Sequence, residues 1–148
     1  MVNLKRYREY WEGVGKRLDS ISGVLPVAID KDMGKKIQQL PLGSVTLFVL
    51  PPGGESEGTN PDAFREWSQG VVFVMEKYDP MRRSAFDVLE SSQGAIEDVK
   101  RIMRADMSTG CPIMNIDLSS LNTLPETEFF AGFAGWSIGF KISAGEWR

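Results

Sequence analysis

The sequence predicts an α+β fold in which helices pack on one face of a mostly antiparallel sheet. Two long stretches, residues 4–21 and 85–107, repeat apolar side chains at helical spacing, whereas shorter stretches alternate apolar and polar residues as strands do. Hairpin-like links between the strands favour antiparallel pairing. The chain has 148 residues, 42% hydrophobic and 25% charged, so we expect a single domain over residues 1–148.

The first 23 residues predict an amphipathic helix. Asn3 can cap its first turn and Gly23 can end it. We expect its apolar face to pack on the core; the alternative is that this face packs on a neighbouring subunit. The face consists of Leu4, Tyr7, Trp11, Val14, Leu18 and Ile21, which recur at spacings of three and four.

Three strands are expected next. Val24–Ile29 contains a proline and predicts an edge strand, Gly43–Leu50 predicts a strand covered on both faces, and Ser68–Tyr78 predicts a third. Asp30–Gln39 is either a turn or a turn followed by a short helical segment. Residues 51–61 are rich in Gly, Pro and acidic residues and predict a long loop, which is either a plain hairpin connection or an arm that reaches a partner.

A long helix follows, preceded by the pattern of a capping box at Ser84 and Asp87. Its apolar residues run from Ala85 to Met107, and Gly94 is a point at which it can divide in two. Basic residues in its C-terminal half complement the helix dipole.

Two strand patterns complete the chain. Residues 113–118 alternate, residues 119–128 form a polar link, and residues 136–143 alternate most clearly, as in a strand with one buried face.

Composition restricts the chemistry. The chain has no histidine, which excludes Ser-His-Asp and Cys-His catalysis and histidine-based zinc sites within it. Cys111 is the single cysteine, so neither an intramolecular disulfide nor an all-thiolate metal site can form. Catalysis by carboxylates, lysine or tyrosine remains formally open. We expect no enzymatic activity, no cofactor and no bound metal.

Charge and hydropathy limit the classes of partner that we expect for the chain. A net charge of −3 with dispersed basic residues is unlike a nucleic-acid-binding protein. The longest uncharged apolar stretch, Val45–Pro52, is too short to span a bilayer, and the N-terminus lacks a signal-peptide core. We therefore expect a protein made and kept in the cytosol, without a membrane partner.

The polar residues that could form a binding site are explained more simply as solvent-exposed surface residues. Gly53 and Gly54 lack the residues of a phosphate-binding loop. Glu55 and Glu57 form an acidic cluster with Asp62, but without the spacing of a calcium loop.

Aromatic residues are more informative and predict a protein interface. Five fall within twelve residues, from Phe129 to Phe140, and Trp147 lies close to the C-terminus. A lone domain has difficulty covering all of them, and exposed aromatic clusters mark interfaces. The predicted interface residues are Trp11, Glu55, Glu57, Trp67, Phe129, Phe130, Phe133 and Trp147.

The order of elements resembles that of the tail terminator proteins of tailed bacteriophages, a family with relatives in contractile injection systems. The chain shares an N-terminal amphipathic helix, a strand pair with a long loop, a central helix and a closing strand. The C-terminal segment PETEFFAGFAGWSIGFKIS is similar to that family's aromatic, Gly-rich link leading into a last strand of the form G-W-x-I-x-F.

The resemblance implies a structural virion protein of the tail and neck, assembled in the host cytoplasm. Such proteins form a six-fold ring that ends polymerisation of the tail tube and joins the head. Their partners are tube and head-tail connector proteins, and no catalytic residue is implied. A closed ring repeats one heterologous interface, so each subunit needs two different contact patches. Glu55 and Glu57 can then line a lumen that repels passing DNA.

Three other interpretations remain open at this point. The chain is equally compatible with another neck component, either a head-completion or adaptor protein, or with a tail-tube subunit. A small-molecule-binding α+β domain would instead show one apolar pocket in a monomer or dimer. An enzyme would rest on carboxylates such as Asp117.

Overall fold

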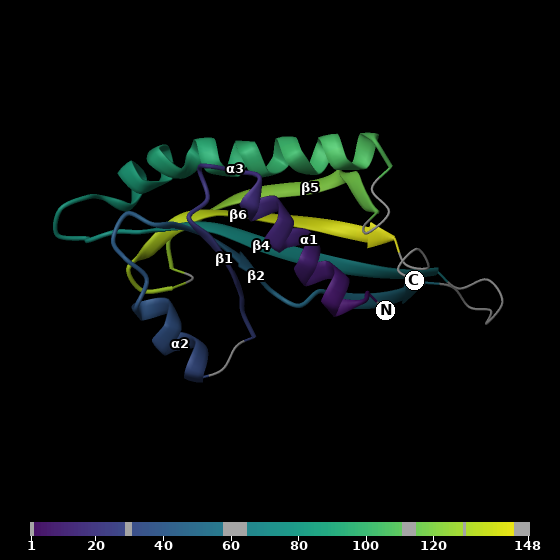
Figure 1. The fold of residues 1–148 in the computed structure, drawn as a ribbon, viewed down its shortest axis with the longest axis horizontal. Coiled ribbons are helices and arrows are strands. Elements are labelled where there is room, and N and C mark those ends of the chain that lie inside the picture. Colours follow the sequence, from purple (N-terminus) through teal and green to yellow (C-terminus); the bar gives the residue numbers. More distant parts are fainter. Residues whose placement is uncertain (1, 29–30, 58–64, 111–114, 129, 144–148) are drawn as a thin grey trace.

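The computed structural model describes residues 2–28, 31–57, 65–110, 115–128 and 130–143, and for residues 31–33, 54–57, 65–67 and 143 it describes the backbone only. Its elements follow one another around a single sheet (Figure 1). In chain order they are α1 (Leu4–Lys16), β1 (Gly23–Pro26), α2 (Lys31–Gln38), β2 (Val45–Val49), β3 (Gly53–Glu57), β4 (Arg65–Lys77), α3 (Ala85–Ser108), β5 (Ile116–Glu126) and β6 (Phe133–Ser143).

The sheet has the strand order β1-β2-β4-β6-β5, with β3 paired to β4 off this path. All of its pairs are antiparallel except β1 with β2. On one side of β4, β2 pairs with residues 72–76 and β3 with residues 65–69. β2 and β3 thus pair one after the other along the same edge of β4. The α+β class predicted from the sequence is confirmed.

Two helices, α1 and α3, cover the first face of the sheet (Figure 1). Trp11 lies at the centre of this layer, fully buried, with its ring 5.1 Å from Tyr10 and 5.7 Å from Phe140 between centroids. Apolar residues of α3, such as Ile96 and Met103, belong to the same core. The predicted packing of the N-terminal helix on the core is therefore confirmed.

Side-chain bonds fix α1 against the C-terminal half of α3. The Tyr10 hydroxyl donates to Asp106 at 2.9 Å, and the Arg17 guanidinium donates to both oxygens of the same carboxylate at 2.9–3.0 Å. This cross-link joins residues 89 or more apart in the chain. It sets the position of α1 on the first face.

The second face of the sheet carries a smaller core covered by α2. Phe48, Met75 and Phe133 are fully buried there, together with Ile37 of α2 and Val27. The segment between β1 and β2, which the sequence left undecided, is thus helical. Beyond α2, described residues of β4, β5 and β6 line an open groove on the second face.

Two segments that the sequence predicts to be connections form strands instead, so these two predictions are wrong. Within residues 51–61, Gly53–Glu57 is β3, and the predicted polar link at 119–128 continues β5 to Glu126. Both segments lack strong alternation of apolar residues, and cross-strand hydrogen bonds to β4 and β6 hold them instead. Residues 58–61 lie outside the described residues.

Other boundaries shift by a few residues. The first helix ends at Lys16, with Arg17 as its C-cap, so Gly23 begins β1 rather than ending the helix. β4 begins at Arg65, three residues before its predicted start. The capping box of Ser84 and Asp87 is confirmed, and α3 runs unbroken past Gly94.

Candidate protein-interaction site

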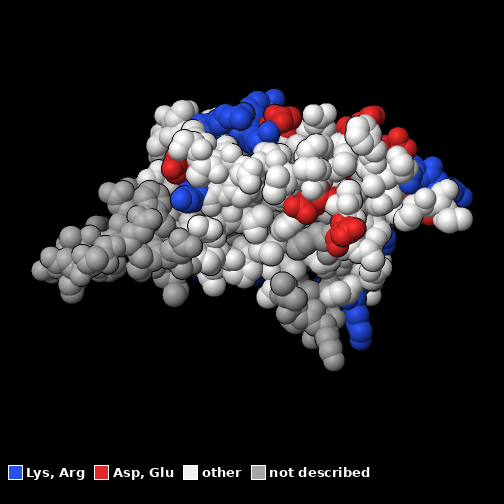
Figure 2. Space-filling model, turned by 180° about the vertical axis from the view of Figure 1, so that it is seen from behind, with Lys and Arg blue, Asp and Glu red and all other residues white. Residues whose placement is uncertain are grey.

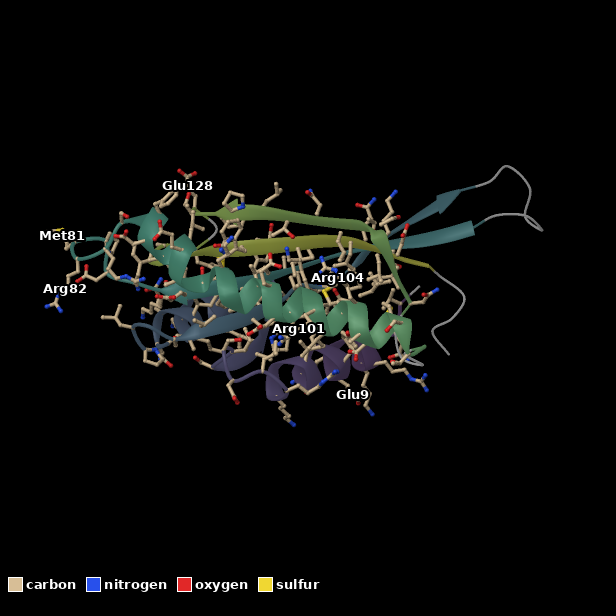
Figure 3. The ribbon with its side chains drawn as sticks, turned by 90° about the horizontal axis from the view of Figure 1, so that it is seen from above. Glu9, Met81, Arg82, Arg101, Arg104 and Glu128 are labelled. Carbon is tan, nitrogen blue, oxygen red and sulfur yellow. The ribbon has the colours of Figure 1, made fainter. Side chains whose placement is uncertain are left out.

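One end of the molecule carries a two-stranded arm, which we define as residues 53–57 of β3 and 65–69 of β4. These strands pair in antiparallel register from Gly53 with Gln69 to Glu57 with Arg65. On its other side β4 pairs with the described part of β6 from Trp67 to Lys77. Among the described residues the arm therefore reaches beyond β6, and Figure 3 shows it extending past the end of α3.

Segments at the opposite end of the sheet carry three exposed apolar side chains, Leu42, Met81 and Phe86, which we together call the end patch. Their exposed fractions are 66%, 92% and 68%. Met81 and Phe86 come from the turn after β4 and the start of α3, and Leu42 precedes Gly43, whose N–H donates to the Lys77 carbonyl at the end of β4. Figure 3 shows Met81 and Arg82 at the tip of this turn, facing away from the body.

The end patch is presented by an ordered turn. The Asp79 carboxylate accepts from the Met81 N–H at 3.0 Å, and the Asp79 carbonyl accepts from Arg82 and Arg83 N–H at 3.0 and 3.1 Å. A side chain held on such a turn loses less conformational freedom when it enters a partner's surface.

An ion pair between half-buried Arg83 and buried Glu76 anchors the same turn to the sheet. Glu76, 6% exposed, accepts hydrogen bonds from the Arg83 guanidinium and, at 2.9 Å, from the Ser91 hydroxyl. Arg83 also donates to Ser91 at 2.8 Å. Strand β4, the turn and α3 are joined through these three side chains.

Two of the predicted interface residues are buried within the chain. Trp11 and Phe133 are both 0% exposed, since Trp11 fills the first-face core and Phe133 packs on Phe48 beneath α2. Their use as surface contacts is a wrong prediction: an apolar residue on a helix or strand face fits core and interface equally well. Phe130 is half-buried, with its ring 5.1 Å from that of Phe48.

The remaining predicted residues are placed only by backbone or lie outside the description. Glu55, Glu57 and Trp67 belong to the arm, where Glu55 pairs with Trp67 and Glu57 with Arg65. Phe129 and Trp147 lie outside the described residues, as do Phe64, Asp62 and Cys111.

Sequence reasoning missed Met81 and Phe86. Met81 stands in a turn directly after Asp79-Pro80, and Phe86 falls off the apolar stripe of α3 that passes through Leu89 and Ile96. An apolar side chain in a turn or off a helical stripe is the pattern that points to such a residue.

A shallow apolar hollow of about 290 Å³ lies beside the N-terminal end of α1. Its walls are formed by α1, the end of β1 and the chain after β2, and they include Leu4, Tyr7, Val27 and Leu50. Burial raises the pKa of the Tyr7 hydroxyl well above its ordinary value. This hydroxyl therefore stays protonated at neutral pH.

Basic side chains gather over the C-terminal half of α3 (Figure 2). Lys100 pairs with Glu97 at 2.6 Å and Arg101 with Asp98 at 3.2 Å, while Arg104 is exposed. The two ion pairs neutralise part of the patch, which weakens its attraction for a polyanion.

Among the described residues, no group of three or more His, Cys, Asp or Glu side chains is placed to hold a metal ion. None of the helices in the described part of the chain is both long and apolar enough to cross a membrane. The chain matches no family model and no curated protein sequence.

Proposed function

We propose that this chain is a structural subunit of a bacteriophage tail. Copies of it close into a six-fold ring at the end of the tail tube, stop tube polymerisation and join the tail to the head. Its partners are other copies of itself, the tube protein and head-tail connector proteins, and DNA passes through the lumen without specific binding. The ring size and the partners rest on the resemblance of the chain to tail terminators.

The observation that carries the proposal is the arm. A two-stranded ribbon that leaves the body of a domain presents backbone that the domain itself does not pair. Within the described residues, positions 65 and 66 of β4 pair with β3 and not with β6. Isolated hairpins are marginal in water, so an arm of this kind gains stability when a partner covers it.

The end patch supplies a second, different contact surface. It lies at the finish of β4, whereas the arm lies at its start, so the two are at opposite ends of one strand (Figures 1 and 3). Two unlike patches on one subunit suit a heterologous interface, which closes into a ring when the rotation between copies permits. We therefore assign the repeated contact to the arm of one copy and the end patch of the next.

Two variants test this assignment. The first, Leu42→Ser with Met81→Ser and Phe86→Ser, removes the end patch. The second replaces residues 56–66 by Asn-Gly, a two-residue turn suited to joining Glu55 and Trp67, which face each other directly in the hairpin. Each variant alone is expected to be a monomer by light scattering, and an equimolar mixture is expected to form dimers, because one intact patch of each kind remains.

Leu124→Ser is the matched control, because Leu124 is 48% exposed on β5, away from both surfaces. It should assemble as the unchanged protein does. An arm-shortened variant that keeps its fold by circular dichroism and still forms the wild-type oligomer would contradict the proposal.

The apolar hollow beside α1 favours a second candidate, a small-molecule-binding domain. Its volume of about 290 Å³ lies at the lower limit of typical ligand pockets, which hold about 300–1,000 Å³. Binding of a dye such as ANS to one site on the unchanged protein would support this function, provided that Leu50→Asp abolishes the binding and leaves the oligomer intact.

A further inference from the structure

From Gly34 onward, where its side chains are described, helix α2 is held to the sheet by few side chains. We call the segment from Gly34 in this helix to Leu40, two residues beyond its end, the strap. Ile37 is the buried side chain of the strap, at 2% exposed, and Leu40 is half-buried, while the other side chains of the strap face solvent. A helix this short is marginal by itself, so its position depends on these contacts.

The C-terminal end of the strap is fastened by Lys77. The Lys77 ammonium donates to the carbonyl oxygens of Gln38 at 2.7 Å and Leu40 at 2.6 Å. A cation at this end of a helix also complements the helix dipole. Lys77 belongs to β4, so one side chain ties the strap to a central strand of the sheet.

The chain beyond the strap is fixed independently of that side chain. The Gly43 N–H donates to the Lys77 carbonyl at 2.8 Å, and the Lys77 N–H donates to the Ser44 carbonyl at 3.1 Å. These bonds use the Lys77 backbone alone. A substitution of the Lys77 side chain therefore frees the end of the strap without detaching β2.

The strap covers the most apolar part of the second face. Phe48, Met75 and Phe133 are 0% exposed beneath it, whereas the first face is covered by the 24-residue helix α3 as well as α1. Val71, which packs against the same cluster, also lines the neighbouring open groove on the sheet, of about 530 Å³. The covered and open parts of the second face are therefore continuous.

We propose that the strap is a latched cover, held by Ile37 and Lys77, which opens as a unit while the sheet, α1 and α3 stay folded. Opening breaks the two Lys77 hydrogen bonds, withdraws Ile37 and extends the open groove over Phe48, Met75 and Phe133. The position of the strap thus decides whether the second face is closed or open. The inference concerns a single copy of the chain and does not rest on the proposed ring.

Hydrogen exchange followed by mass spectrometry tests the latch. In the unchanged protein, amides of residues 35–40 are expected to exchange through an opening that depends weakly on denaturant, whereas those of β2 and β4 require global unfolding. Lys77→Met should speed exchange of residues 35–40 by about ten- to a hundred-fold, the effect of losing hydrogen bonds from a charged group. Exchange in α1 and α3 should stay unchanged.

Lys141→Met is the matched control. Lys141 is an exposed lysine of β6, the strand next to β4, and the strand register places it on the same face of the sheet as Lys77. It should leave exchange in the strap unaltered. The proposal is overturned if residues 35–40 of the unchanged protein exchange only with global unfolding. It is equally overturned if Lys77→Met raises exchange evenly through the sheet. The wild-type measurement decides the matter even if the variant fails to fold.

Discussion

At the scale of single residues, the first face depends on close approach at Gly70. A Cβ atom at this position would lie 2.5 and 2.6 Å from two ring atoms of Phe140 and 2.8 Å from the Tyr7 hydroxyl. The absence of a side chain lets both aromatic rings lie directly on β4. The packing of α1 on the sheet thus depends on one missing methyl group.

Gly70→Ala is expected to destabilise the protein by about 1–3 kcal/mol, the cost of overpacking a core. Gly94→Ala is the contrasting control. Its Cβ would meet nothing within 4 Å on the exposed side of α3, and it should stabilise by about 0.5–1 kcal/mol because alanine suits a helix better. Chemical denaturation measures both, and equal midpoints for the two variants would refute the packing argument.

The Glu76 ion pair gives a second prediction at this scale. Glu76→Gln should cost about 1–3 kcal/mol, because it weakens two hydrogen bonds to a buried acceptor, one of them to a charged partner. Arg82→Ala removes the neighbouring exposed pair with Asp79, at 3.8 Å, and should change stability by less than about 1 kcal/mol. Thermal melts compare them; a larger loss for Arg82→Ala would mean that burial is not what distinguishes the pairs.

At the scale of elements, α3 begins at a reciprocal cap. The Asp87 N–H donates to the Ser84 hydroxyl, and the Ser84 N–H donates to the Asp87 carboxylate, both at 3.1 Å. The backbone and side-chain hydrogen bonds with Ser84 lower the pKa of Asp87 below its ordinary value of 3.8. Because the folded pKa is the lower one, the carboxylate stabilises the fold above its unfolded pKa, and this stabilisation is lost as the pH falls through the folded pKa.

Asp87→Asn is therefore expected to lower Tm at neutral pH, and the difference in Tm should shrink as the pH falls below the ordinary pKa of 3.8 and the Asp87 carboxyl takes up a proton. Glu90→Gln makes the same charge change one turn further along α3 and should shift Tm less at neutral pH. Thermal unfolding across this pH range gives the answer. A Tm difference between Asp87→Asn and the unchanged protein that is constant with pH would rule out the charged cap.

Elements that carry their own pattern could be predicted from the sequence. The helical spacing from Leu4 to Val14 and the capping box at Ser84 specify α1 and α3 locally. Apolar runs specify β2 and the centre of β4, and alternation specifies β6. β3 and the second half of β5 could not be predicted, because their stability comes from pairing with strands distant in sequence. The interface residues could not be predicted for a similar reason. Trp11 and Phe133 are aromatic residues of the kind found at interfaces, and only their packing shows that they belong to the core.

At the scale of the whole molecule, the arm and the end patch lie at opposite ends of β4 (Figure 1). The sheet between them is fixed by two cores, one on each face. A rigid body with unlike contact surfaces at its two ends suits repeated head-to-tail contact. This arrangement is what the proposed ring of identical subunits requires.

The acidic residues of the arm give a prediction at this scale. If Glu55 and Glu57 line a lumen that repels DNA, then Glu55→Gln with Glu57→Gln should leave assembly intact and raise retention of the oligomer on DNA-cellulose at low salt. The control is Glu9→Gln with Glu12→Gln on α1, which removes the same charge away from the arm. Equal retention of the two double variants would show that the charges of Glu55 and Glu57 do not repel DNA from a lumen.

The most direct test of the central claim is the mass of the unchanged protein in solution, measured by light scattering over a concentration series, with negative-stain images of the same sample. The proposed terminator ring predicts particles of six copies that appear as six-fold rings. A species that stays monomeric at every concentration, or that stops at a symmetric dimer, would contradict it.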